Sequence, residues 1–380
     1  MYKRNIYLLW GIALLQGMVF YGPVATLYRQ AAGLGIFHIT LIESISLALT
    51  IFLEIPWGAL ADRIGYRKTM VGCCFLYFVS KIVFWKAEGF SGFLLERLLL
   101  SVVCAGLSGV DSSMLYLSSA GEDSHRVFSI HENLGQLGLL LAACIYGLWV
   151  GENYRLAAFL TVLSYGAAAV LSLCLREVIR TPKESSSVTG NLLTVLKKQL
   201  TDPCILLLLL AVGLLNESHQ TITVFLSQLQ YAKAGMSHEA MSLAYVLTSL
   251  AGLAGGFSAA VCARMGAKRM GTGLFVLGSV SCLLLVVSSK PLICVTAVIL
   301  LRLSFSLLQP LHVELQNRQI IGRDRATALS VNAVVMESIG ILLNLIYGGI
   351  AEENLAHAMF LGSALCGLGM ILYRRSCHFR

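Results

Sequence analysis

The sequence predicts an all-α membrane protein with twelve transmembrane helices in two pseudo-symmetric six-helix bundles. The prediction rests on the composition, the spacing of the apolar segments and a repeat between the two halves. Of 380 residues, 57% are hydrophobic and 13% are charged, whereas soluble domains carry about 25% charged residues. Most of the surface of this protein is therefore expected to face lipid.

The apolar segments have the length of membrane spans. A helix needs about 20 mostly apolar residues to cross about 30 Å of hydrocarbon. The backbone polar groups find no water there, so each span is expected to be helical. We place the spans at about 6–28, 39–61, 69–86, 91–117, 127–150, 155–175, 204–230, 239–263, 270–288, 291–312, 326–350 and 355–373.

The basic residues predict the orientation, because Lys and Arg accumulate in cytoplasmic loops. With the N-terminus inside, 20 of the 28 Lys and Arg residues lie on the cytoplasmic side. Three lie within spans, and five lie on the external side of the membrane: Arg29, Lys86, Arg155, Lys233 and Lys290. We therefore expect a multi-pass protein of the cell (inner or cytoplasmic) membrane with both termini in the cytoplasm.

A long polar stretch, Arg176 to Asp202, divides the twelve spans into six and six. Its composition is typical of a solvated linker. We expect an N-terminal bundle over residues 1–175, a cytoplasmic linker over 176–203 and a C-terminal bundle over 204–380.

The two halves are also related in sequence. At an offset of 201, Ile145-Tyr146-Gly147 falls on Ile346-Tyr347-Gly348, and Arg63-Ile64-Gly65 falls on Arg264-Met265-Gly266. Internal repeats of this kind are typical of secondary transporters, whose binding sites lie near the membrane midplane.

Composition also argues against other classes of protein. The net charge of +8 comes from short loops and not from a basic folded face, so we expect no nucleic-acid partner. The eleven cysteines lie mostly in apolar segments without metal-ligand spacing and are interpreted as packing residues. We expect no metal and no cofactor, a monomer in contact with membrane lipids, and a small molecule as the substrate.

The segment after the second expected span reads Gly58-Ala59-Leu60-Ala61-Asp62-Arg63-Ile64-Gly65-Tyr66-Arg67-Lys68. It resembles the cytoplasmic loop signature of the major facilitator superfamily, G-x-L-[AS]-D-[RK]-x-G-R-[RK], and departs from it at Tyr66. The twelve-span layout extends the resemblance over the whole chain, which looks like a drug/proton antiporter of this superfamily. The resemblance assigns a gating role to the loop residues Gly58, Asp62, Arg63, Gly65 and Arg67.

Ionisable residues inside spans are costly and often functional. In the fourth expected span, polar residues recur at steps of three and four: Arg97, Ser101, Cys104, Ser108 and Asp111. This spacing predicts one polar helix face that lines a cavity. The tenth span repeats the design with Arg302, Ser306 and Gln309. The superfamily resemblance makes both arginines cavity residues, because its first, fourth, seventh and tenth helices surround the substrate path.

The seventh expected span holds the densest polar cluster, Asn216, Glu217, Ser218, His219, Gln220 and Thr221. These residues either bind a ligand or mark a local break in the helix. At the repeat offset, Glu217 falls on Gln16 of the first span, which is followed by Phe20 and Tyr21. We expect Asn216, Glu217, Gln220, Gln16, Phe20 and Tyr21 to line the cavity, with Glu217 binding a proton or cation; the alternative is a structural ion pair with Arg97 or Arg302.

Further ionisable residues lie in other spans. Glu337 occupies the middle of the eleventh expected span and is a cavity candidate. Glu43, Glu54 and Lys81 are expected to form structural ion pairs within the first half.

Together these features predict a secondary active transporter that moves a small organic molecule by alternating access. The sequence contains no nucleotide-binding loop, so an ion gradient is the expected energy source. We expect proton-coupled efflux. Antiporters of this superfamily carry a signature with a Gly-Pro pair in the fifth helix. The segment Gly135-Gln136-Leu137-Gly138 in the fifth expected span lacks this proline. Proton-coupled uptake of a small metabolite therefore remains an alternative. A membrane enzyme is disfavoured because no catalytic motif is visible, and a sensor would need an added signalling domain.

Overall fold

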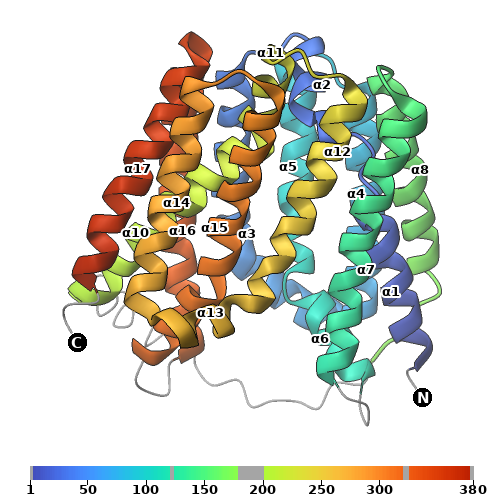
Figure 1. Ribbon diagram of the computed structural model, residues 1–380. Helices are drawn as coiled ribbons and strands as arrows, with labels where there is room; N and C mark the ends of the chain where they lie inside the picture. The colour runs from blue at the N-terminus through green and yellow to red at the C-terminus, as the bar shows by residue number, and fades with distance from the viewer. Residues whose placement is uncertain (1–2, 120–123, 179–200, 320–324, 377–380) are drawn as a thin grey trace. The chain divides into compact units, whose positions relative to one another are not determined.

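The computed structural model describes residues 3–119, 124–178, 201–319 and 325–376, and the elements assigned there are helices (Figure 1). Within these residues, twelve helical segments are long and apolar enough to cross a membrane. This finding confirms the twelve spans expected from the sequence. The expected linker, residues 176–203, lies largely outside the described residues.

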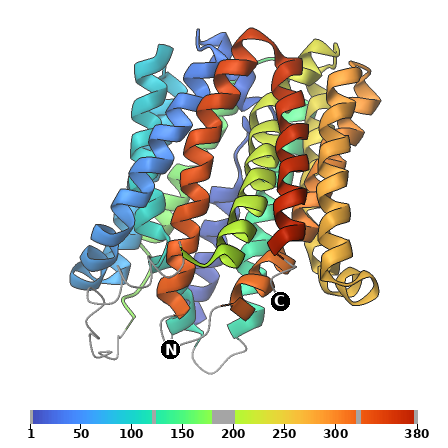
Figure 2. The ribbon, with the colours of Figure 1, turned by 90° about the vertical axis from the view of Figure 1, so that its left-hand side faces the viewer.

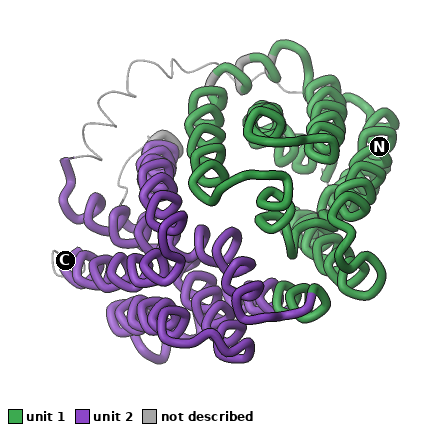
Figure 3. Tube along the Cα trace, turned by 90° about the horizontal axis from the view of Figure 1, so that it is seen from above, with its two compact units in different colours: residues 1–183, 238–246 green, residues 184–237, 247–380 purple. Residues whose placement is uncertain are grey.

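The chain divides into two compact units (Figure 3). Unit 1 comprises residues 1–183 and 238–246, and unit 2 comprises residues 184–237 and 247–380. In this view along the helix axes, each unit is a bundle of helices that lie side by side (Figure 3).

Unit 1 contains most of the first half of the chain. Its elements are α1 (Lys3–Gly17), η1 (Gly22–Val24), α2 (Ala25–Ala31), α3 (Ile36–Ile64), α4 (Tyr66–Lys86), α5 (Gly89–Leu107), α6 (Val110–Ser118), α7 (Ser124–Ile145), the π-helical η2 (Tyr146–Val150) and α8 (Tyr154–Ser172). The beginning of α12 (His238–Ala251) also belongs to it, and Ser242 Oγ donates a hydrogen bond of 2.5 Å to the carbonyl of Ala143.

Unit 2 contains the remaining elements. They are α10 (Pro203–Gln220), the π-helical η3 (Thr221–Leu226), α11 (Ser227–Lys233), the end of α12, the 3₁₀-helical η4 (Gly252–Phe257), α13 (Ser258–Met265), α14 (Ala267–Val287), α15 (Pro291–Gln319), α16 (Arg325–Glu353) and α17 (Leu355–Ser376). Helices α10, α16 and α17 lie side by side (Figure 2).

Each unit has its own apolar core. In unit 1, Leu9 of α1 and Met114 of α6 are fully buried in a cluster with residues of α4 and α8. In unit 2, Leu215 of α10 and Phe275 of α14 are fully buried with residues of α15 and α17. Because lipid is as apolar as these side chains, the helices are held mainly by close packing and by polar contacts between them.

The first span is not one continuous helix, contrary to the expectation for 6–28. Helix α1 ends at Gly17, and η1 and α2 follow after a non-helical stretch. Gly22 and Pro23 explain the break, because glycine weakens a helix and proline removes a backbone donor.

Helix α8 supplies the hydrogen bonds that this break requires. Thr161 Oγ1 accepts from the backbone N–H of Phe20 at 3.0 Å, Ser164 Oγ donates to the carbonyl of Leu15 at 2.6 Å, and the Tyr165 hydroxyl donates to the carbonyl of Gln16 at 2.5 Å. Backbone groups inside a membrane need such protein partners, since water is absent. The break is therefore a fixed structural feature that positions Gln16, Phe20 and Tyr21.

The seventh and eighth spans are also irregular. The seventh changes from α-helix to π-helix at Thr221, the last residue of its polar cluster. The eighth changes to 3₁₀-helix at Gly252, within the glycine-rich Gly252–Phe257. The local break that the polar cluster suggested therefore takes the form of a wide helical turn, a feature frequent at functional sites.

Candidate functional site

Unit 1 holds a buried ion pair beside the break in the first span. Lys81 Nζ of α4 lies 3.2 Å from Glu96 Oε1 of α5, with side chains 5% and 1% exposed. The ammonium also donates to the Tyr21 hydroxyl at 3.2 Å and lies over the rings of Tyr77 and Tyr165. An aromatic ring attracts a nearby cation, so the pair is held on several sides.

A second ion pair joins α3 to α5. The Arg97 guanidinium binds the carboxylate of Glu43, and both side chains are 18% exposed. One turn further along α5, Ser101 is buried against Ser46 with a hydroxyl separation of 2.7 Å. The expectation of ion pairs within the first half is thus met for Lys81 and Glu43. Glu96 was not among the residues expected from the sequence, although an ionisable residue within a span was the available signal.

The polar stripe expected along the fourth span does not form one continuous face. Helix α5 ends at Leu107 and α6 begins at Val110, so the break separates Arg97 and Ser101 from Asp111. Asp111 Oδ2 lies 3.1 Å from His131 Nε2 of α7, and Ser108 is exposed. Ser101 packs against α3, where Ser46 supplies the partner that a buried hydroxyl needs.

In unit 2, Glu217 lies at the centre of a small polar network. Its side chain is 5% exposed, and its Oε1 lies 3.0 Å from Thr221 Oγ1. The same Thr221 hydroxyl lies 3.1 Å from Oδ1 of Asn344 on α16. One residue after Glu217, Ser218 Oγ accepts a hydrogen bond of 2.8 Å from the Tyr347 hydroxyl. Buried polar networks of this kind fix helix positions.

A second group in unit 2 surrounds His219, which is 1% exposed. Its ring stacks on Phe305 of α15 with centroids 4.3 Å apart, and its Nε2 lies 3.2 Å from Arg302 Nη1. Because a guanidinium can only donate, Nε2 must accept and the ring hydrogen must sit on Nδ1. Gly252 leaves room for this arginine, since a Cβ there would lie 2.7 Å from Arg302 Nη2.

The remaining candidates lie outside these networks. Asn216 and Glu337 are half-buried, whereas Gln220 and Gln309 are exposed. Asn332 of α16 is 1% exposed, and neither of its amide atoms has a hydrogen-bond partner among the described residues. Asn332 was not among the residues expected from the sequence.

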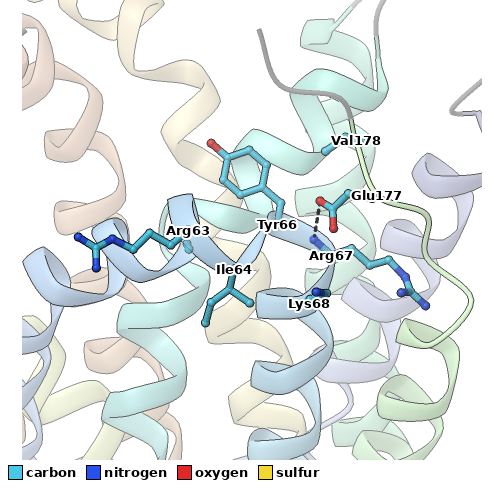
Figure 4. Close-up of a pocket in the computed structure, with 9 residues that line it drawn as sticks. Arg63, Ile64, Tyr66, Arg67, Lys68, Glu177 and Val178 are labelled. Atoms are coloured by element: carbon cyan, nitrogen blue, oxygen red, sulfur yellow. Dashed lines mark hydrogen bonds between the residues drawn. The ribbon is translucent and has the colours of Figure 1, made fainter. Parts of the chain in front are cut away.

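The loop between α3 and α4 turns at Gly65, whose φ of +98° lies in the region that favours glycine. Arg67 follows the turn and donates from Nε to the carbonyl of Leu175 at 2.6 Å and from Nη2 to that of Leu173 at 3.1 Å. Its backbone N–H donates to Glu177 (Figure 4). Arg67 therefore ties the start of α4 to the chain that follows α8, where a cation suits the free carbonyls of a helix end.

The loop borders a surface pocket of about 490 Å³ lined by residues 61, 63–68, 177 and 178. Arg63 is exposed and points away from Glu177 (Figure 4). The surroundings of Gly58 and the side chain of Asp62 lie outside what the structure describes. The repeated turn in the second half, at Gly266, also has a positive φ of 78°, so the sequence repeat marks the same backbone turn twice.

Within the described residues, no group of three or more His, Cys, Asp and Glu residues has the arrangement of a metal site. The site residues instead form hydrogen-bonded and ionic networks within each unit.

Comparisons with known proteins agree with this architecture. The profile of the Major Facilitator Superfamily matches residues 8–345. A comparison with curated protein sequences finds no match.

Solved structures share the fold over nearly the whole chain. A mutant of the nucleoside transporter NupG has a TM-score of 0.83 and 14% sequence identity, covering 98% of this chain and 99% of its own. A bacterial homologue of the human lysosomal transporter Spinster, inward-facing and occupied, has a TM-score of 0.77 and 13% identity, covering 99% and 96%. An auto-inhibited peptide transporter of the POT family gives 0.76 and 14%, covering 100% and 97%. Because the family profile matches residues 8–345, the chain belongs to the Major Facilitator Superfamily.

Proposed function

We propose that the chain is a proton-coupled carrier that exports a small organic molecule by alternating access. In such carriers the substrate site opens to one side of the membrane at a time, and an ion gradient drives the cycle. The membership of the superfamily and the twelve spans support transport as the general activity. The coupling to protons is proposed from the network around Glu217.

The observation that carries the proposal is the single hydrogen shared in this network. The Thr221 hydroxyl has one hydrogen, yet it lies within hydrogen-bond distance of two acceptor oxygens, those of Glu217 and Asn344. A protonated Glu217 resolves the conflict, because it donates to Thr221, which then donates to Asn344.

An ionised Glu217 requires a different arrangement. The carboxylate then accepts from Thr221, and Asn344 must turn its amide so that Nδ2 donates to the hydroxyl. The network therefore has two satisfied states that differ by one proton and by the orientation of one amide. The π-helical turn that begins at Thr221 lies where such a rearrangement would occur.

The loop after α3 is proposed to control the cycle. By resemblance to the superfamily signature, Asp62, Arg63 and Arg67 form a lock that opens and closes during alternation. The contacts of Arg67 with the carbonyls after α8 support this role, since breaking them would release the start of α4.

Small-molecule profiling of cells tests the proposal. Cells that express the wild-type protein, Glu217→Gln or an empty vector are analysed by mass spectrometry, together with their medium. We expect the wild-type protein to deplete a set of compounds inside the cells and enrich them outside, and Glu217→Gln to lower this effect at least tenfold. Glu88→Gln is the matched control, because Glu88 is 81% exposed and lies outside the network.

Two results would contradict the proposal. Profiles that are identical for wild-type and empty-vector cells, at verified expression, would exclude export. Full export by Glu217→Gln would exclude this carboxyl group as the proton carrier.

Proton-coupled uptake of a small metabolite is the second candidate. It is favoured by the missing proline in Gly135-Gln136-Leu137-Gly138 and by the similarity in fold to a nucleoside transporter and a peptide transporter. The same profiles distinguish it, because uptake enriches compounds inside the cells.

A further inference from the structure

Three cations and two anions lie at one end of unit 1, where Arg29, Lys81 and Glu96 are buried and Arg97 and Glu43 are 18% exposed. Arg29, Lys81 and Arg97 are the cations, and Glu43 and Glu96 are the anions. The connections that follow α2 and α4 meet at this end, where the backbone N–H of Gly89 donates to the carbonyl of Ala32 at 3.3 Å. At 1.5 Å per residue, all but Arg29 lie about 8–12 Å inside their helix ends.

Two of the three cations have a carboxylate of their own. Lys81 pairs with Glu96, and Arg97 pairs with Glu43. Arg29 is 6% exposed, and its guanidinium forms no ion pair with a carboxylate among the described residues. The contact recorded for this guanidinium is with the Phe84 ring, 5.7 Å away.

The charges around Arg29 do not neutralise it. Glu96 and Glu43 are the carboxylates of this cluster, and they are already paired with Lys81 and Arg97 respectively. A buried charge is costly unless it is paired, so this end of unit 1 has an uncompensated positive charge.

We propose that Arg29, together with Arg97, binds an anionic group of the transported molecule, a carboxylate or a phosphate. This inference rests on the proposed function and names the substrate class. A guanidinium presents a planar fork of donors that matches both groups. Arg97 contributes a further donor, because its Nε is buried without a partner among the described residues.

Arg97 and Glu43 form the more exposed side of the cluster. Arg97 and Glu43 are each 18% exposed, whereas Lys81 and Glu96 are 5% and 1% exposed. The Lys81–Glu96 pair therefore serves as a fixed support, and the anion binds at Arg29 and Arg97 in competition with Glu43.

Thermal unfolding of the purified full-length protein tests this site. At constant ionic strength, chloride is replaced by benzoate, succinate or phenyl phosphate, with benzamide as a neutral counterpart of benzoate. We expect at least one of the three anions to raise the Tm of the wild-type protein by several degrees over chloride, because a bound ligand stabilises the folded state. Benzamide should have no such effect.

Variants assign the effect to Arg29. Arg29→Gln should lose the anion-dependent shift and, in chloride, should unfold at or above the wild-type Tm, because an unpaired buried cation has been removed. Arg155→Gln is the control, since Arg155 is a half-exposed arginine of the same unit, and it should keep the shift.

The profiling experiment provides a second readout. We expect the transported compounds to be acids and Arg29→Gln to lower their transport at least tenfold.

Several results would overturn the assignment. The first is an equal Tm in chloride and in all three organic anions. The second is an Arg29→Gln variant that keeps the anion-dependent rise in Tm or that fails to fold. The third is a set of transported compounds that are neutral or cationic. If Arg29→Gln transports normally while Glu217→Gln does not, the anion site is excluded and the proposed function stands.

Discussion

At the scale of single residues, Lys81 shows how a charged side chain is paired inside the membrane. The sequence indicated that it would be paired, and the structure pairs it with Glu96 of the neighbouring helix α5. Nearly complete burial makes the pair interdependent, because the loss of one member leaves the other as a buried, unpaired charge.

We predict that Lys81→Met destabilises the protein by about 3–5 kcal/mol, the usual cost of leaving one member of a buried pair without its partner. The double variant Lys81→Met/Glu96→Leu should recover most of this loss. Denaturant unfolding of the purified protein measures both values.

The control for this prediction is Arg155→Gln, which removes an exposed pair with Glu88 and should cost less than about 1 kcal/mol. If the double variant is as unstable as the single one, Lys81 stabilises the protein through its aromatic contacts and not through its charge.

At the scale of elements, glycines determine how closely α1 approaches α7. A Cβ added to Gly138 would lie 2.2 Å from the carbonyl oxygen of Leu14, and one added to Gly17 would lie 2.1 Å from that of Gly135. Small residues at such crossings allow backbones to pack closely in membranes. Gly17 is the last residue of α1, so this close contact lies directly before the break in the first span.

We predict that Gly138→Ala lowers the free energy of unfolding by about 1–3 kcal/mol, because the methyl group forces α1 away from α7. Gly72→Ala in α4 is the matched control, since no atom lies within 4 Å of its added Cβ. The control should be neutral or slightly stabilising. Equal effects of the two substitutions, measured by thermal unfolding, would show that the close approach is not required.

At the scale of the whole molecule, the two units carry different chemistry. Unit 1 buries ion pairs around Lys81 and Arg97, and unit 2 buries the networks of Glu217 and His219. The sequence repeat is therefore kept in the helices and in the turns at Gly65 and Gly266, while the polar residues have diverged. This division suits a carrier in which one unit binds an anionic group and the other a proton.

The distribution of Lys and Arg predicts that both termini lie in the cytoplasm. A green fluorescent protein fused to the C-terminus should therefore fluoresce in a bacterial host, and alkaline phosphatase inserted after Glu88 should be active. Both reporters indicate location, because the fluorescent protein folds in the cytoplasm and the phosphatase becomes active outside it. If the C-terminal fusion does not fluoresce and the phosphatase after Glu88 is inactive, the predicted orientation is wrong.

The sequence by itself determined the twelve spans, the repeat and the loop after α3. These features depend on local composition and spacing, and the hydrocarbon core enforces them on each segment separately. Gly65 could be identified as a turn residue for the same reason. Glu217 could be selected because an ionisable residue within a span is conspicuous in any context.

The tertiary structure alone decided which side chains meet. Lys81 with Glu96, Asp111 with His131, and His219 between Arg302 and Phe305 are pairings between different helices. They depend on how each helix is rotated and on where it breaks, as α5 does before Asp111. Packing over the whole unit sets the rotation of each helix and the position of its break. An unpaired charge such as that of Arg29 can therefore be identified only from the positions of all its neighbours.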